Sequence, residues 1–280
     1  MKGFGKDWGV LAIGLFFAVM IILIAAFFLG QKASWIRKQG TQEARLAKSL
    51  ENEKQKQDMR TPVRLALIAD IHAGGSAKRL NQEGRMIQPN LALIKLDKVL
   101  KRIKQENFDG VIDLGDNITT REDKEYYKYL KEVFDQYDLN YIFVLGNHDR
   151  ESVYGEYLWD EFYYARDIKD VRIIVLNTNN PNDYHGDLPK KQLEWLQEQL
   201  ETDKQVVIAM HHPVKEKQDR GDFVDWFWDF KNIIGRRKNV KFVLSGHYHF
   251  SFEFEYEGVI YKTVGPLTLE DFEGFEEIDI

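Results

Sequence analysis

The chain has 280 residues, of which 44% are apolar and 30% charged, and its formal net charge is −6. This length suits one large or two small domains. The acidic balance argues against nucleic acid as the main partner, because phosphate backbones are bound through Lys and Arg. The absence of cysteine excludes disulfides, thiolate metal sites and a cysteine nucleophile.

The first feature along the chain is a long apolar segment near the N-terminus. No charged residue lies between Asp7 and Lys32, and residues 8–30 read WGVLAIGLFFAVMIILIAAFFLG. A helix of that length spans roughly 35 Å, against a hydrocarbon core of about 30 Å. A cleaved signal peptide has a shorter apolar region that ends at a small-x-small site. We therefore predict that residues 1–30 form a single-pass membrane anchor. Basic residues flank it on both sides, so the side of the membrane on which the following domain lies is left open.

The next segment, residues 31–60, is rich in Gln, Lys, Glu and Ala. These are good helix formers, and the segment has few apolar positions, so we predict a polar helical stalk or linker. Pro62 marks the start of a compact region, and we predict one domain over residues 61–280.

Within that domain, apolar runs at residues 63–70, 108–116, 141–149, 171–178, 205–213 and 240–249 predict buried strands. Apolar residues at helical spacing predict helices around residues 96–103, 130–137 and 193–200. The aromatic run 222–230 is interpreted as a further helix. Residues 251–265 alternate with period two around a Glu-Gly pair, which predicts a hairpin, and the acidic end of the chain is interpreted as a terminal strand. The predicted fold class is α/β, with sheets covered by helices.

Six of the seven histidines fall at the ends of predicted strands, and only His185 does not. In α/β folds, ligands bind beyond the carboxyl ends of the strands. Each cluster alone has a plain alternative, such as a turn for Gly-Asn-His-Asp. Their common placement predicts one site, built from Asp70-Ile71-His72, Gly115-Asp116-Asn117, Gly146-Asn147-His148-Asp149, His211-His212 and Gly246-His247-Tyr248-His249.

Imidazole, carboxylate and amide oxygen suit divalent first-row metals such as Mn, Fe or Zn, and the absence of thiolate argues against a closed structural zinc site. Six or seven ligands are too many for one ion with an open position. They suit two ions that share a carboxylate, the arrangement that clamps the attacking and leaving oxygens in phosphoryl transfer. The identity of the metal stays open.

The five blocks, in this order over residues 63–270, resemble the pattern of the calcineurin-like metallophosphoesterases. The resemblance implies a four-layer α/β/β/α sandwich and a metal-dependent phosphoric ester hydrolase. It implies that Asp116 bridges two divalent ions, of which the first is bound by Asp70, His72 and His249 and the second by Asn147, His211 and His247.

The resemblance also implies that His148 is the general acid or binds phosphate, and that Asp149 orients His148 or supports the loop. His212 is interpreted as a core histidine or a support for a ligand.

After residue 178, the sequence is similar to the cyclic-nucleotide phosphodiesterase-like branch at Gly186, Leu188, Gln192, Leu193, Trp195 and Leu196. The same pattern is also that of an amphipathic helix packed on the sheet. Thr119 stands where purple acid phosphatases have a tyrosine ligand, which disfavours that branch. The segment NITTRED lacks the Asp-Arg-Gly of protein phosphatases.

The loop 74–90 follows the first block and is expected to overhang the site. Lys78, Arg79 and Arg85 in that loop either contact substrate phosphate or are only solvated.

The leading hypothesis is a membrane-anchored, two-metal phosphoesterase acting on a phosphomonoester, a phosphodiester including a cyclic nucleotide, or a pyrophosphate; a lipid-linked phosphate is also open. The alternative is a catalytically inactive binding or scaffold module of the same fold, whose signature would be a missing ligand residue, and none is missing. A metal-dependent nuclease is disfavoured by the acidic balance. The sequence does not indicate an oligomeric state.

Overall fold

The computed structural model describes residues 62–75, 79–81, 83–121, 123–180, 186–214 and 226–280, together with residues 20, 29–32, 35, 37 and 39–49. The chain divides into two compact units, Met1–Thr61 and Pro62–Ile280. Among the described residues, no helix is both long and apolar enough to cross a membrane. Apart from Met20, Leu29 and Gly30, the predicted anchor at residues 8–30 lies outside the described residues, so it stays a prediction. In the predicted stalk, residues 39–49 are helical and exposed.

The first sheet of the C-terminal unit has the strand order β12-β1-β4-β5. Strands β1 (Arg64–Ile68), β4 (Gly110–Asp113) and β5 (Tyr141–Phe143) run parallel, and β12 (Glu276–Asp279) pairs antiparallel with β1 at one edge. Every residue of β4 is buried, in keeping with the continuous apolar run that predicted it. Strands of a sheet that is covered on both faces are apolar at nearly every position, because both sets of side chains are buried.

The second sheet has the order β10-β11-β9-β8-β7-β6. Its strands are β6 (Tyr164–Ile168), β7 (Val171–Val175), β8 (Gln205–Ala209), β9 (Val240–Ser245), β10 (Phe252–Tyr256) and β11 (Val259–Thr263). The central strands run parallel, and β6 and β10 pair antiparallel at the two edges. The predicted hairpin is confirmed as β10–β11. Its turn residues Glu257 and Gly258 have φ of 52° and 78°, as a two-residue hairpin turn requires.

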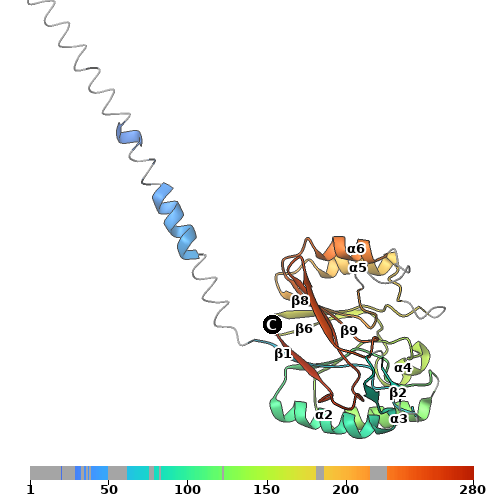
Figure 1. The fold of residues 1–280 in the computed structure, drawn as a ribbon. Coiled ribbons are helices and arrows are strands. Elements are labelled where there is room, and N and C mark those ends of the chain that lie inside the picture. Colours follow the sequence, from blue (N-terminus) through green and yellow to red (C-terminus); the bar gives the residue numbers. More distant parts are fainter. Residues whose placement is uncertain are drawn as a thin grey trace, which may run out of the picture. The chain divides into compact units, whose positions relative to one another are not determined.

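Helices cover the outer faces of the sheets. A short 3-10 helix, Pro89–Leu91, leads into α2 (Ala92–Glu106), and α3 (Lys124–Asp135) and α4 (Glu151–Tyr157) follow later in the chain. These helices lie on one side of the paired sheets, and α5 (Lys190–Gln199) and α6 (Trp226–Ile234) lie on the other (Figure 1). The predicted helices around residues 96–103, 130–137 and 193–200 correspond to α2, α3 and α5. The predicted α/β class, with two mixed sheets, is confirmed.

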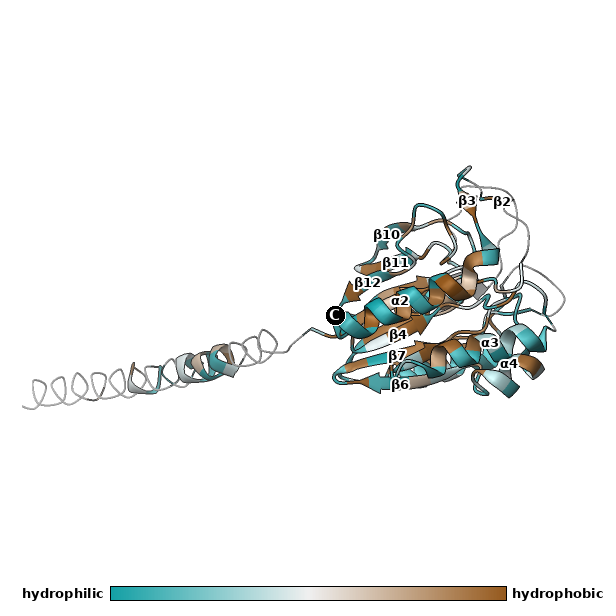
Figure 2. Cartoon of the chain, turned by 90° about the horizontal axis from the view of Figure 1, so that it is seen from below, coloured by the Kyte–Doolittle hydropathy of each residue, from teal (hydrophilic) through white to brown (hydrophobic). Residues whose placement is uncertain are grey.

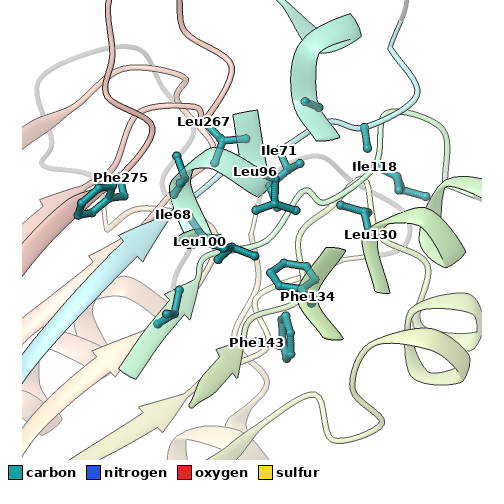
Figure 3. Packing of buried hydrophobic residues seen from close by; sticks show 14 of the residues in the cluster. Ile68, Ile71, Leu96, Leu100, Ile118, Leu130, Phe134, Phe143, Leu267 and Phe275 are labelled. Carbon is teal, nitrogen blue, oxygen red and sulfur yellow. The ribbon is translucent and has the colours of Figure 1, made fainter. Parts of the chain in front are cut away.

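Three separate apolar clusters join the layers. The first packs α2, α3 and α4 on the first sheet, where Leu100 and Phe134 meet Ile68 and Phe143 (Figure 3). A second cluster fills the space between the two sheets, and a third joins the second sheet to α5 and α6. In Figure 2, which shows hydropathy along the chain, strand β4 is apolar and helix α2 is mixed. The layers therefore follow the order helix, sheet, sheet, helix.

Several elements were not predicted, among them β6 and α4. Strand β6 contains Arg166 and Asp167 and is only partly buried, because an edge strand can leave its outer residues in solvent. Helix α4 has seven residues and contains Gly155, which is too short for a clear helical period. A small hairpin, β2 (Arg79–Leu80) with β3 (Met86–Ile87), lies within the loop expected to overhang the site.

Candidate metal centre

The structure brings all seven predicted ligands to one place. They follow the carboxyl ends of five parallel strands, three from the first sheet and two from the second. The two sheets meet at this end, where Leu267 N–H, beyond β11 of the second sheet, donates to the Ala69 carbonyl, beyond β1 of the first. Metal binding by these side chains stays a prediction. The distances between their ligand atoms show whether the site has room for metal ions.

One group comprises Asp70, His72, Asp116 and His249, whose ligand atoms all lie within 4.8 Å of one another. The Nε2 atoms of His72 and His249 are 2.9 Å apart, and His249 Nε2 lies 3.3 Å from Asp70 Oδ1. Two neighbouring ligands at about 2.1 Å from a shared ion are themselves roughly 3 Å apart. The spacing therefore fits a cation between them.

A second group surrounds Asn147. Its Oδ1 lies 3.1 Å from His211 Nε2 and 3.0 Å from His247 Nδ1. The Nδ1 of His211 lies 2.7 Å from the Leu114 carbonyl. Since a carbonyl only accepts, Nδ1 carries a proton and Nε2 is the nitrogen that faces the site, as in metal-binding histidines whose other nitrogen is hydrogen-bonded.

Asp116 belongs to both groups. Its Oδ2 lies 3.3 Å from His211 Nε2 and 3.8 Å from His72 Nε2. A buried carboxylate in contact with histidines of two ligand groups is placed as a bridge between two ions. The donor set therefore fits two divalent cations.

His212 lies beside this second group, with a ligand atom within 4.8 Å of those of His211 and His247. Its Nδ1 lies 2.9 Å from the Thr178 hydroxyl. This contact agrees with the interpretation of His212 as a support.

Five of the predicted ligands have a left-handed backbone. The φ angles are 49° at Asp70, 48° at His72, 58° at Asp116, 73° at His247 and 58° at His249. They make up five of the eight non-glycine residues with positive φ in the described part of the chain. This conformation costs about 1–2 kcal/mol for each such residue and persists where the fold enforces it, often at functional sites.

The electrostatics keep most of these groups in the form that binds metal, which is the ionised carboxylate and the neutral imidazole. Burial alone would raise the pKa of Asp116, but His211 and His72 hold it well below its usual range. Burial lowers the pKa of His72 to about 3 and, together with His211, that of His247 to about 4. His211 differs: against the effect of burial, Asp116 raises its pKa to about 9. The Asp116 carboxylate thus attracts positive charge strongly at this point.

His148 borders the cluster without joining either ligand group. Its backbone N–H donates to Asp116 Oδ1 over 2.7 Å, and its ring Nδ1 donates to the Thr119 carbonyl over 2.9 Å. The ring centroid lies 4.9 Å from that of His72. The imidazole is therefore held beside the ligands, where the predicted contact with substrate would occur.

Asp149 is buried beneath the loops and faces away from solvent. Its carboxylate accepts hydrogen bonds from the backbone N–H groups of Asp116, Asn117 and Gly146 at 3.0, 3.1 and 3.1 Å. It also accepts one from the Tyr127 hydroxyl at 2.7 Å. Of the two predicted roles, this geometry is that of loop support, because the His148 ring is oriented by Thr119 instead.

Two further contacts were not anticipated from the sequence. Arg121 Nε donates to the Asn147 carbonyl over 2.7 Å, and Asn81 Nδ2 donates to the His249 carbonyl over 2.7 Å. Asn81 lies in the loop expected to overhang the site. Of the three cations singled out there, Arg85 lies 4.0 Å from Glu83, while Lys78 and the side chain of Arg79 lie outside the described residues.

Comparison with known proteins agrees with this fold. A family model described as "Calcineurin-like phosphoesterase" matches residues 63–251. The chain therefore belongs to the calcineurin-like phosphoesterases, which confirms the resemblance drawn from its motifs.

Among curated relatives, the chain is similar to a cAMP/cGMP dual-specificity phosphodiesterase from Mycobacterium tuberculosis, with 29% identity over 69% of this chain and 63% of the relative. It is also similar to a probable glycerophosphodiester phosphodiesterase from Arcobacter nitrofigilis, with 32% identity over 50% of this chain and 56% of the relative. The chain thus spans less than two thirds of the length of these relatives.

Among solved structures, a dimetal phosphatase from Danio rerio has a similar fold. Its TM-score is 0.65 at 16% identity, and the match covers 79% of this chain and 93% of that one. At this identity the likeness concerns the fold alone.

Proposed function

We propose that this chain is a dinuclear metal-dependent phosphodiesterase. The observation that carries the proposal is the position of Asp116, whose Oδ2 lies 3.3 Å from a histidine of one ligand group and 3.8 Å from a histidine of the other. A shared carboxylate of this kind is what two closely spaced ions require. Asp70, His72 and His249 hold one ion, and Asn147, His211 and His247 hold the other.

The bound ions supply a Lewis acid and a hydroxide nucleophile at neutral pH. The chain's own residues orient the ester and move a proton. His148 is held by its Nδ1–H to the Thr119 carbonyl, so its Nε2 is the nitrogen that can exchange a proton with the leaving oxygen. Asp149 keeps the loops of Asp116 and Asn147 together through their backbone amides.

The substrate class we propose is a phosphodiester, such as a cyclic nucleotide or a glycerophosphodiester. The activities by which the two curated relatives are named support this choice. A phosphomonoester is the alternative that the assay below tests.

We further propose that residues 8–30 anchor the enzyme in a membrane as a single span. The support is the absence of any charged residue between Asp7 and Lys32. Residues 31–60 would then link the anchor to the catalytic domain. Alkaline carbonate extraction tests this: the full chain stays in the membrane pellet if the anchor is right and is released if it is wrong.

The alternative function is an inactive binding or scaffold module of the same fold. All seven ligand positions are occupied by metal-binding residues, which weighs against it.

The deciding experiment uses the full chain in mild detergent, stripped of metal and reloaded with Mn²⁺. Hydrolysis of bis-p-nitrophenyl phosphate, p-nitrophenyl phosphate and cAMP is compared with that of an Asn147→Ala variant. Mn²⁺-dependent turnover of the diesters, lost in the variant, supports the proposal. Faster turnover of the monoester than of either diester would contradict the diesterase assignment. A folded chain that binds two ions but turns over no ester would favour the inactive module.

A further inference from the structure

The small hairpin β2–β3 is fixed on the domain close to the candidate metal centre. Gln88 N–H donates to the Thr268 carbonyl over 3.0 Å, and Glu270 N–H donates to the Met86 carbonyl over 2.9 Å. The turn between the strands is closed by Asn81 N–H to the Arg85 carbonyl over 2.8 Å. The hairpin is therefore held in place by backbone hydrogen bonds to residues 268–270.

The Asn81 side chain is oriented by this turn. Its Oδ1 accepts hydrogen bonds from the N–H groups of Glu83 and Arg85, at 3.0 and 2.8 Å. With the oxygen committed to the turn, Nδ2 points the other way and donates to the His249 carbonyl over 2.7 Å. Only a side-chain amide combines these acceptor and donor functions at one carbon.

His249 is a predicted ligand in a conformation that L-residues seldom adopt. Its φ is 58°, and its Nε2 lies 2.9 Å from His72 Nε2 and 3.3 Å from Asp70 Oδ1. Return of this residue to an ordinary φ would rotate the peptide whose carbonyl Asn81 holds and would move the imidazole away from the cluster. The bond from Asn81 opposes that rotation.

We propose that Asn81 is a positioning residue, which holds the backbone of His249 and so determines how tightly the ion of Asp70, His72 and His249 is bound. This inference rests on the proposed function. Removal of a residue that orients a metal ligand typically weakens metal affinity by about 10- to 100-fold. Because Asn81 touches only one ligand group, the ion of Asn147, His211 and His247 should be unaffected.

A purely structural role for Asn81 would be to fasten the hairpin to the fold. Two variants separate the roles. Asn81→Ala removes all three hydrogen bonds, while Asn81→Ser keeps an oxygen that can accept from the turn amides but has no N–H long enough to reach His249. Asn239→Ala is the matched control. Asn239 lies just before β9, and its Nδ2 likewise donates to backbone carbonyls, those of Thr202 and Lys204, at 3.0 and 3.1 Å.

The test is a calorimetric titration of Mn²⁺ into the metal-free full chain. We expect two binding events for the wild type, and for Asn81→Ala and Asn81→Ser one event weakened about 10- to 100-fold with the other unchanged. Asn239→Ala should match the wild type. In a His249→Ala background, Asn81→Ala should have no further effect on metal binding.

The outcomes distinguish the two proposals. A wild type that binds no ion overturns the proposed function and this inference together. A wild type that binds two ions, with both unchanged in Asn81→Ala, overturns only the role of Asn81. Wild-type affinity in Asn81→Ser, or equal weakening of both ions in Asn81→Ala, also overturns it, because the hairpin would then act through the fold as a whole.

Discussion

The carboxylate of Asp149 lies 3.0 Å from the backbone nitrogen of Asp116 and accepts its hydrogen bond. It also accepts from Asn117 and Gly146. One buried side chain thus joins the loop that carries the predicted bridging ligand to the loop that carries Asn147. The two loops come from β4 and β5, which are neighbours in the first sheet.

Asp149→Ala should therefore lower the free energy of unfolding by at least about 3 kcal/mol, because three backbone amides lose their acceptor and each unsatisfied buried group costs about 1–3 kcal/mol. Asp149→Asn should lose much less, since its oxygen can serve the amides and its NH2 group can donate to the Tyr127 hydroxyl. Urea unfolding of the metal-free chain measures both. Equal losses in the two variants would show that the negative charge, and not the loop contacts, is what matters.

Gly146 permits the close approach of the same two loops. A Cβ at this position would lie 2.2 Å from Asp116 N and 2.3 Å from Asp116 Oδ1, distances that no side chain can occupy. Gly146→Ala should displace Asp116 and abolish the binding of at least one ion. Gly155→Ala in α4 is the matched control, because its nearest neighbour would be 3.5 Å away and Ala favours the helix by about 0.5–1 kcal/mol. If Gly146→Ala binds Mn²⁺ like the wild type, the described loop contact is wrong.

His148 is expected to protonate the leaving oxygen. Its removal should matter most for a poor leaving group, and general acids contribute about 10²–10⁴-fold. His148→Asn should therefore slow hydrolysis of an alkyl diester by that factor and slow bis-p-nitrophenyl phosphate much less. Metal content should stay the same, because His148 is not a predicted ligand. An equal decrease for both esters would assign His148 to phosphate binding in place of proton transfer.

Asp113 gives the domain a pH-dependent stability. Burial and the nearby Asp149 raise its pKa to about 8, against about 3.9 in an unfolded chain. Between these values the folded state retains a proton that the unfolded state has lost. Stability contributed by this group therefore falls as pH rises from about 4 to 8, by about 1.4 kcal/mol for each unit of pH.

Asp113→Asn cannot ionise and should gain stability over the wild type as pH rises from 5 to 8. Thermal unfolding at both values measures the change. Asp135→Asn is the control, since Asp135 is exposed and lies 2.8 Å from Lys131. Parallel curves for the wild type and Asp113→Asn would mean that Asp113 ionises in the folded state as it does in water.

The sequence predicted well that the candidate ligands lie together, because each lies shortly after an apolar strand. Parallel strands bring their carboxyl ends to one edge, so the local pattern at Asp70 or His247 was enough to place it. The contact between Asn81 and His249 has no such signal, because 168 residues separate them and a turn asparagine is common. The left-handed backbone at the predicted ligands was also not predictable, because the presence of Asp or His in a sequence does not by itself indicate a positive φ.

The layer order could be inferred from the family resemblance, but the edge strand β6 and the helix α4 could not. Strand β6 is half polar, and α4 is a single short helix after Arg150. Both depend on packing partners distant in sequence. Tyr164, for example, donates its hydroxyl to the Phe143 carbonyl in the other sheet.

The central claim is that two ions share Asp116. Electron paramagnetic resonance of the full chain loaded with Mn²⁺, together with the metal content per chain, tests it most directly. The account predicts two Mn²⁺ per chain and an exchange-coupled signal, which requires ions a few ångströms apart, and it predicts that Asp116→Ala abolishes the coupling. One Mn²⁺ per chain, or two without coupling, would contradict a shared dinuclear site.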